Sequence, residues 1–358
     1  MVTELDYKIG LYRPHLLHQV VDLLQYLWGE DIDTNLQYFK WKYDDNPYAK
    51  VPLGIVALIN GKVVGFRGYF ATKWQIRSKN TQILVLCPGD TCVHPDHRRR
   101  NLSVLMGKLA IKEYTSEYSI FFNLSATSKS TPGYLKMGFI PLLTKTLLTR
   151  SNLLGMTKFL LIRKKKSDFN RGKFTFGTFD NIVVSDCPKP KEMADVISRQ
   201  DNYNNRITLF QDEVFFKWRF QNKRNKYLFY YFKDNNIIKS YIVIRLSQNN
   251  RRGYICDYAA DDERYFEIIL DFIIKMKRLD IISIYNFSLT DNFSRILKNL
   301  SFRENSLIRL IEKRLNGEWP LLIRPVNKDF SESDLNIEGT DIRKAGNWEI
   351  KEICSDAA

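Results

Sequence analysis

Residues 87–107, CPGDTCVHPDHRRRNLSVLMG, join a predicted strand to a predicted helix through a cationic turn. The apolar residues 83–86 precede this stretch, and Pro95 ends the extended run. Three consecutive arginines, residues 98–100, then precede apolar residues at helical spacing: Leu102, Leu105, Met106, Leu109 and Ile111. Because free amides at a helix start and guanidinium groups both bind phosphate oxygens, the stretch predicts an anion site that suits a pyrophosphate.

The composition limits the class of protein. The chain has 358 residues, enough for two domains that each bury a core. Its 13% aromatic, 44% hydrophobic and 27% charged residues are typical of a folded globular protein. The net charge of +15 indicates an anionic partner, which is a nucleic acid, a membrane surface or a small substrate with several phosphates.

The five cysteines are scattered, odd in number and without the paired short spacing of zinc ligands. We therefore expect reduced thiols and no metal. The first ten residues, MVTELDYKIG, carry acidic residues where a signal peptide is apolar, and no uncharged apolar run is long enough to span a bilayer. A cytoplasmic protein without a membrane partner is the expectation.

The two halves of the chain repeat one order of patterns. Residues 38–43, YFKWKY, are echoed by residues 215–220, FFKWRF, and a predicted hairpin follows each, with an Asn-Gly turn at 60–61 in the first half. Residues 134–139 are echoed in the same way by residues 297–302. The sequence therefore predicts a duplicated fold.

We expect four segments. The first is a catalytic domain at residues 1–155, followed by a basic linker or crossover at 156–178. A second domain of the same kind is expected at 179–315, and a C-terminal tail at 316–358, ordered around Trp348, has no functional assignment.

The order of helix, helix, hairpin, strand, basic turn, helix, strand and helix resembles the GNAT superfamily of acyl-CoA-dependent N-acyltransferases. The family sequence Tyr-x-x-x-Gly-Phe falls on residues 134–139, and its pyrophosphate loop, Gln/Arg-x-x-Gly-x-Gly/Ala, falls on residues 98–103. Asn101 and Ser103 replace the two glycines, but Asn tolerates a left-handed backbone and Ser is small. The resemblance implies an α/β class with mixed α+β sheets: two GNAT-like domains in tandem, each a central mixed β-sheet flanked by helices.

The duplication, with Trp-Lys-Tyr-x-x-Asn-Pro at residues 41–47, looks like bacterial tandem-GNAT enzymes that N-acylate nucleotide-linked amino sugars for surface polysaccharide such as O-antigen or capsule. Members similar in appearance act on dTDP-linked 3-amino-3,6-dideoxyhexoses. The resemblance implies acyl-coenzyme A as donor and direct attack by the amine in a ternary complex. A positively charged chain suits both polyanionic substrates.

The resemblance also implies site residues. Tyr134 has the family position of the general acid that protonates the CoA thiolate. The base is not identified, but Asp90 and His94 flank the strand and are candidates to relay a proton through water. Lys42 and Asn46 are candidate acceptor contacts. Donor contacts are expected from the strand, the loop and a serine-rich turn: Thr91, Cys92, Val93, Arg98, Arg99, Arg100, Asn101, Leu102, Ser103, Ser128 and Ser130.

The second half is expected not to bind CoA. Residues 259–263, AADDE, place three carboxylates where the first half has its arginines, and Leu297 stands at the position of Tyr134. Like charge repels a pyrophosphate, so this half is predicted to be a degenerate repeat that packs on the first and forms one wall of an acceptor site.

Two other functions stay open at this point. A tandem-GNAT aminoacyltransferase of the peptidoglycan-bridging type takes aminoacyl-tRNA and needs no pyrophosphate loop. A non-catalytic basic protein that binds nucleic acid is not favoured, because the positive residues are spread through the chain and the aromatic residues lie in apolar runs. The acyl group, the sugar, the nucleotide and the oligomeric state do not follow from the sequence.

Overall fold

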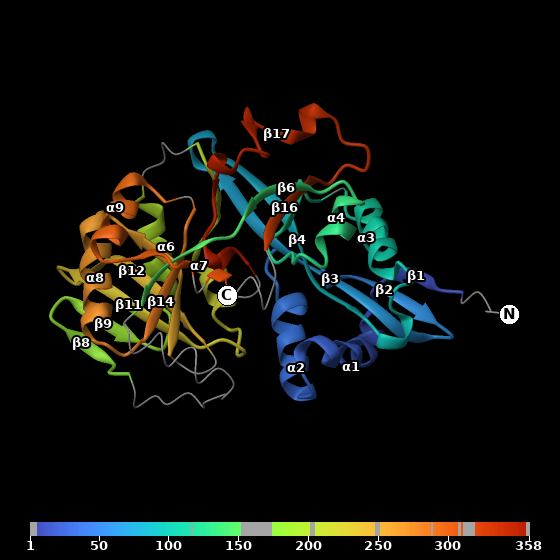
Figure 1. Cartoon of the computed structure of the whole chain (residues 1–358), viewed down its shortest axis with the longest axis horizontal. Helices are drawn as coiled ribbons and strands as arrows, with labels where there is room; N and C mark the ends of the chain where they lie inside the picture. Colours follow the sequence, from blue (N-terminus) through green and yellow to red (C-terminus); the bar gives the residue numbers. More distant parts are fainter. Residues whose placement is uncertain are drawn as a thin grey trace. The chain divides into compact units, whose positions relative to one another are not determined.

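A computed structural model describes residues 6–115, 117–151, 174–200, 205–247, 251–287, 289–306, 309–310 and 319–355. Most of the predicted linker, residues 156–173, lies outside these ranges. The chain forms two compact units, each a mixed sheet with helices (Figure 1). Unit 1 comprises Met1–Thr144, Asn205–Phe210 and Gly317–Trp348, and unit 2 comprises Lys145–Asn204, Gln211–Asn316 and Glu349–Ala358. Among the described helices, none combines the length and the apolar character needed to cross a membrane.

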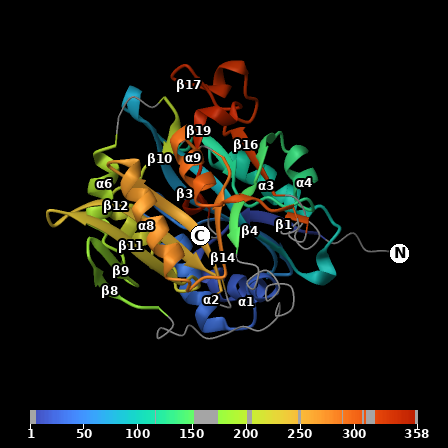
Figure 2. The same ribbon diagram turned by 60° about the vertical axis from the view of Figure 1, so that its left-hand side comes forward.

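The sheet of unit 1 has the strand order β1-β2-β3-β4-β5-β16-β6. Strands β1 to β4 are antiparallel neighbours, β4 and β5 are parallel, and β16 is antiparallel to both β5 and β6. Strand β10 pairs with the end of β3, and β19 pairs with β10 (Figure 2). The bounds are β1 Lys8–Leu11, β2 Leu53–Ile59, β3 Lys62–Ile76, β4 Thr81–Val93, β5 Ile120–Asn123, β6 Ile140–Thr144, β10 Ile207–Leu209, β16 Pro320–Pro325 and β19 Trp348–Glu349.

The turn between β2 and β3 has the geometry that its sequence predicts. Asn60 and Gly61 are its two residues, with φ angles of 50° and 77°. Left-handed backbone at both positions is characteristic of the two-residue turn that matches strand twist, and Asn-Gly is its preferred sequence. The predicted hairpin is confirmed.

Helices cover both faces of the unit 1 sheet, and alternate strand residues point to opposite faces. Ile55 and Ala57 belong to the core under α3, whereas Val56 and Phe66 belong to a second core under α1. The helices are α1 Leu17–Trp28, α2 Ile32–Phe39, α3 Leu102–Glu113 and α4 Thr131–Leu135 (Figure 1).

Unit 2 repeats this plan, with the order β15-β7-β14-β13-β12-β11-β9-β8. The repeated ending is visible in the backbone: Gly138 and Ser301 are both left-handed, with φ of 80° and 65°, and each precedes the phenylalanine of its motif. The bounds are β7 Leu147–Ser151, β8 Gly177–Phe179, β9 Ile182–Ser185, α6 Pro190–Ser198, α7 Glu213–Arg219, β11 Tyr227–Asp234, β12 Ile237–Leu246, β13 Arg252–Ala260, α8 Glu263–Lys275, β14 Ile281–Tyr285, α9 Asp291–Asn299 and β15 Arg303–Glu304.

Each sheet contains strands from the other part of the sequence. Besides β10 and β19, unit 1 takes in β16, which lies between β5 and β6, and β7, which follows β6 in sequence, lies between β14 and β15 in unit 2. The predicted boundaries at 155, 179 and 315 therefore differ from the observed division, and part of the predicted tail 316–358 is a strand of the first sheet. The reason is that strand pairing is set by long-range contacts.

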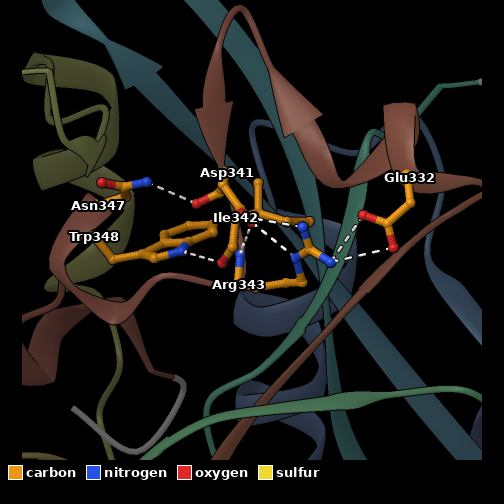
Figure 3. A network of polar contacts seen from close by, with 6 residues as sticks. All are labelled: Glu332, Asp341, Ile342, Arg343, Asn347 and Trp348. Carbon is orange, nitrogen blue, oxygen red and sulfur yellow. Dashed lines mark hydrogen bonds and ion pairs between the residues drawn. The ribbon is translucent and has the colours of Figure 1, made fainter.

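The segment after β16 is anchored by a polar network and a buried indole (Figure 3). The Arg343 guanidinium pairs with Asp341 at 3.0 Å and with Glu332 at 3.0 Å, and Asn347 donates to the Asp341 carbonyl at 2.8 Å. The short strands β17 and β18, Asn336–Ile337 and Thr340–Asp341, pair within it. Trp348 is fully buried and donates to the Ile342 carbonyl at 2.8 Å.

Trp348→Ala is expected to lower the free energy of unfolding by about 3 to 5 kcal/mol, because it leaves a cavity beside Trp74 and Phe122. Urea denaturation measures this. Val51→Ala, at a side chain that is 62% exposed, is the control and should change stability by no more than about 0.5 kcal/mol. A Trp348 variant as stable as this control would contradict the structural role.

Candidate functional site

The central strands β4 and β5 pair over a short length and then separate. The pairing joins Val85 and Leu86 of β4 to β5. Beyond Leu86, β4 continues to Val93 alongside β3. Pro88 stands directly after the separation, and a proline has no amide hydrogen with which to continue a ladder. The described sheet therefore leaves one edge of β4 open over the predicted donor contacts Thr91, Cys92 and Val93.

The loop after β4 turns through two left-handed residues. Arg99 has a φ of 62° and Asn101 a φ of 60°. The left-handed conformation expected for Asn101 is present, and this residue precedes α3 without a side-chain hydrogen bond to the helix. All three arginines of the loop are exposed, and Arg98 donates to the Val93 carbonyl at 3.1 Å. The first amides of α3 thus meet the loop without a side-chain cap.

The corresponding helix of unit 2 begins differently. Asp262 caps α8 by accepting a hydrogen bond from the Arg264 amide at 2.8 Å. Asp261 pairs with Arg199 at 2.9 Å and with Lys239 at 3.5 Å. A carboxylate already occupies this helix start, which leaves it unsuited to a second anion.

A buried arginine that the sequence reasoning missed joins the predicted site elements. Arg67 lies in β3 opposite Thr91, and its side chain is 3% exposed. Its Nη1 donates to the Ser103 carbonyl at 2.9 Å, and its Cζ lies 4.6 Å from the ring centre of Tyr134. Strand β4, the start of α3 and the predicted acid therefore meet at Arg67. The sequence did contain a sign of this buried residue, because Arg67 stands inside the apolar run VVGFRGYFA.

The groups around Arg67 keep it charged. Burial alone would lower the pKa of the guanidinium, but the Tyr134 and Tyr69 phenols raise that pKa above its ordinary value. Burial in turn raises the pKa of Tyr69 to about 12, although the Arg67 charge opposes this shift. At neutral pH Arg67 is therefore a cation beside the protonated Tyr69 phenol.

Comparisons with known proteins bear on this arrangement. No family model and no curated protein matches the sequence. Many solved structures share its architecture, among them the following three. A GCN5-related N-acetyltransferase from Anabaena variabilis is 12% identical, with a TM-score of 0.61 over 90% of this chain and 73% of that chain.

The other two extend the comparison to bound donors and to tandem proteins. The N-myristoyltransferase of Saccharomyces cerevisiae with bound myristoyl-CoA is 14% identical, with a TM-score of 0.53 over 90% of this chain and 83% of that chain. A tandem GNAT protein from the clavulanic acid biosynthesis pathway is 9% identical, with a TM-score of 0.50 over 90% of this chain and 99% of that chain. The chain has a tandem GNAT fold. The predicted fold class is confirmed.

Within this GNAT fold, the Asp90 side chain is 11% exposed and anchors β4. Its carboxylate accepts hydrogen bonds from Trp28 at 2.9 Å, from Lys42 at 2.5 Å and from Tyr43 at 2.7 Å. Burial alone would raise the pKa of Asp90, but the Lys42 ammonium and these donors bring it below its ordinary value. The carboxylate is therefore ionised and fully engaged, which suits an anchor better than the proton relay expected from the sequence.

The predicted acceptor contacts lie inside the protein. The Lys42 side chain is 1% exposed because it pairs with Asp90, and Asn46 is 4% exposed. The Asn46 amide donates to the Ala71 carbonyl at 3.1 Å. Neither side chain presents a surface to an acceptor in this structure, so we do not retain them as acceptor contacts.

The remaining predicted residues lie at turns, in β4 or at the start of α3. Both ring nitrogens of His94 are engaged, one by the Asp96 amide at 3.4 Å and the other by the Tyr26 hydroxyl at 3.2 Å. Ser130 bonds to Thr127 in the turn before α4, whereas Ser128 is exposed. Cys92 and Leu102 have buried side chains, which leaves their backbone groups for the expected contacts. Within the described ranges, no group of three or more His, Cys, Asp or Glu side chains forms a metal site.

Asp90→Asn is expected to lower the free energy of unfolding at pH 7 by about 3 to 5 kcal/mol, because Lys42 stays buried without its partner. The folded pKa of Asp90 is lowered, so its contribution is present above the unfolded value of about 3.9 and is lost as pH falls through the folded pKa. The stability difference from the unaltered protein should therefore narrow at acid pH.

Urea denaturation at a series of pH values measures this difference. Asp96→Asn is the control, since that carboxylate is 83% exposed. A difference for Asp90→Asn that is small at pH 7, or constant with pH, would contradict the anchor role.

Proposed function

We propose that the protein is an acyl-CoA-dependent N-acyltransferase with a single donor site in unit 1. The observation that carries this proposal is the open edge of β4 leading into a left-handed loop and an uncapped helix start. The buried Arg67 lies beneath them.

Each part of this site suits one part of coenzyme A. The first amides of α3 and the guanidinium groups of the loop, residues 98–103, bind the pyrophosphate. The open edge of β4 at residues 91–93 offers backbone groups to the amide-rich pantetheine arm, as an added strand would. A peptide amide of the same edge stabilises the oxyanion that forms on the thioester carbonyl.

Unit 2 shares the fold without the donor chemistry. Asp262 already occupies the start of α8, and Asp261 adds negative charge beside it. Leu297, fully buried, stands where unit 1 has Tyr134. One acyl-CoA per chain is the consequence.

The reaction needs a neutral amine, a polarised carbonyl and a proton for the departing thiolate. The amine attacks the thioester carbon, a C–N bond forms and the C–S bond breaks. Tyr134 gives its phenolic proton to the thiolate, so coenzyme A leaves as a thiol, and the phenolate regains a proton from water. The attacking nitrogen becomes positively charged as the C–N bond forms, and it loses its extra proton to solvent, since Asp90 is engaged in an ion pair and His94 is held in its turn.

The acceptor in this proposal is a nucleotide-linked amino sugar, a dTDP-3-amino-3,6-dideoxyhexose, acylated for surface polysaccharide. The resemblance of the duplicated sequence to such enzymes supports it. The net charge of +15 supports it as well, because both substrates are polyanions.

Purified protein incubated with acyl-CoAs of several chain lengths is expected to release thiol only when a nucleotide-linked amino sugar is present. A panel of dTDP-linked and UDP-linked amino sugars, with the matching hydroxyl sugars as controls, identifies the acceptor. Calorimetric titration should give one bound CoA per chain. Binding of aminoacyl-tRNA without binding of CoA would contradict the proposal and support the bridging-type aminoacyltransferase.

Tyr134→Phe is expected to reduce kcat by about 100-fold or more, the usual contribution of a general acid, while the Kd for acyl-CoA changes little. Steady-state thiol release and calorimetry give the two quantities. Tyr114→Phe is the matched control, since this partly buried phenol at the C-terminal end of α3 donates a hydrogen bond to the Gly54 carbonyl. An unchanged kcat for Tyr134→Phe would remove Tyr134 from the mechanism.

A further inference from the structure

Arg67 is a buried cation for which the described chain supplies no carboxylate. Its side chain is 3% exposed, and its Nε has no hydrogen-bond partner in the described structure. Its Nη1 donates to the uncharged Ser103 carbonyl, and its other hydrogen-bonded neighbours are the Tyr69 and Tyr134 side chains, none of which is a carboxylate. Buried charges are normally paired, because an unpaired charge in a dry environment is costly. A cation retained in such a place is suited to a negative charge that appears only during turnover.

The groups around Arg67 show where such a charge would form. The Tyr134 ring is the nearest aromatic, with its centre 4.6 Å from the guanidinium carbon, and the Tyr69 ring centre is 5.8 Å away. Tyr114 on α3 contacts Tyr69 edge-on, at 5.7 Å between ring centres. On the side of β16, Arg324 donates to the Met137 carbonyl at 2.9 Å just after α4.

We propose that Arg67 is a positioning residue, which holds the Tyr134 phenol for proton transfer and stabilises the phenolate that the transfer leaves. The inference rests on the proposed function, in which Tyr134 protonates the CoA thiolate. When the O–H bond of Tyr134 breaks, its proton goes to sulfur and its electron pair stays on the phenol oxygen. The fixed guanidinium then faces an anion and needs no rearrangement.

The same contacts link the donor loop to the acid. Arg67 bonds to the first turn of α3 through the Ser103 carbonyl, and it pairs with Thr91 on the side of β4 that β3 covers, across the strand from the open edge. A CoA molecule seated on the loop and along residues 91–93 therefore lies close to the arginine that contacts the Tyr134 ring. The spatial order of loop, arginine and tyrosine is what a proton donor to the thiolate requires.

The test is the ionisation of Tyr134, followed without any turnover. The full chain is labelled with 3-fluorotyrosine, whose phenol titrates at lower pH than tyrosine, and fluorine NMR spectra are recorded from pH 6 upward. The chain has 19 tyrosines, so Tyr134→Phe assigns the Tyr134 signal by its disappearance. Removing a nearby positive charge disfavours the phenolate, so in Arg67→Gln this signal should titrate at least about one pH unit higher, a tenfold weaker acid.

Two variants separate charge from packing. Arg67→Lys keeps the positive charge and should restore the acid strength of Tyr134 to within about threefold. Arg324 is a second buried arginine, 3% exposed like Arg67, and it donates to the Met137 carbonyl just after α4. Arg324→Gln should leave the pH at which Tyr134 titrates unchanged. An equal shift in Arg67→Gln and Arg324→Gln would make the effect one of packing and overturn the inference.

A comparison within the unaltered protein covers the case in which Arg67→Gln does not fold. Burial raises the pKa of Tyr114, and the neighbouring Tyr69 phenol raises it further. The Tyr134 signal should therefore titrate below that of Tyr114, and the reverse order would overturn the inference. Because this readout needs no acyl transfer, a failed Arg67 effect in a protein that transfers acyl groups refutes the inference alone. Absence of transfer with every substrate refutes the proposed function alone.

Discussion

The separation of β4 from β5 is the constraint on which the rest of unit 1 depends. Strands that stayed paired would consume the backbone groups of β4 and close the edge on which a donor can lie. Pro88 removes one ladder donor at the point of separation, and the register with β3 shifts between Arg67 and Tyr69. Asp90 then ties the irregular strand to three hydrogen-bond donors, the side chains of Trp28, Lys42 and Tyr43. The open edge is thus held by buried charge.

Comparison with unit 2 separates the features that belong to the shared fold from those described only for unit 1. Its corresponding strands β12 and β13 also shift register, between Val243 and Ile244, and Asp257 is buried beside the shift. Asp257 accepts hydrogen bonds from Tyr241 and Gln211, both at 2.9 Å. A buried aspartate at the irregular strand recurs in unit 2, which supports a structural role for Asp90. In the described part of unit 2, Asp262 caps the start of α8 and Leu297 takes the place of Tyr134.

Local chemistry made much of the fold predictable from the sequence. The Asn-Gly hairpin at 60–61 and the left-handed Asn101 follow from side chains acting on their own backbone, and the helix at 102–113 follows from its periodicity. Pairing between strands far apart in the sequence leaves no such local signal. The sequence therefore did not predict that β16 lies between β5 and β6, or that β7 lies between β14 and β15. Nor did it predict the burial of polar groups. Lysine is usually exposed, so the sequence suggested that Lys42 contacts a ligand. Its ion pair is made with Asp90, which is 48 residues away in sequence and comes close only in the folded chain.

We propose that the chain has one donor site, on β4 and the start of α3. A crystal structure of the full chain with bound CoA would show where the donor lies. We expect the pyrophosphate within hydrogen-bond distance of backbone amides of residues 99–103, with the pantetheine arm along residues 91–93. CoA bound at residues 261–263 of unit 2, or away from the open edge of β4, would contradict it.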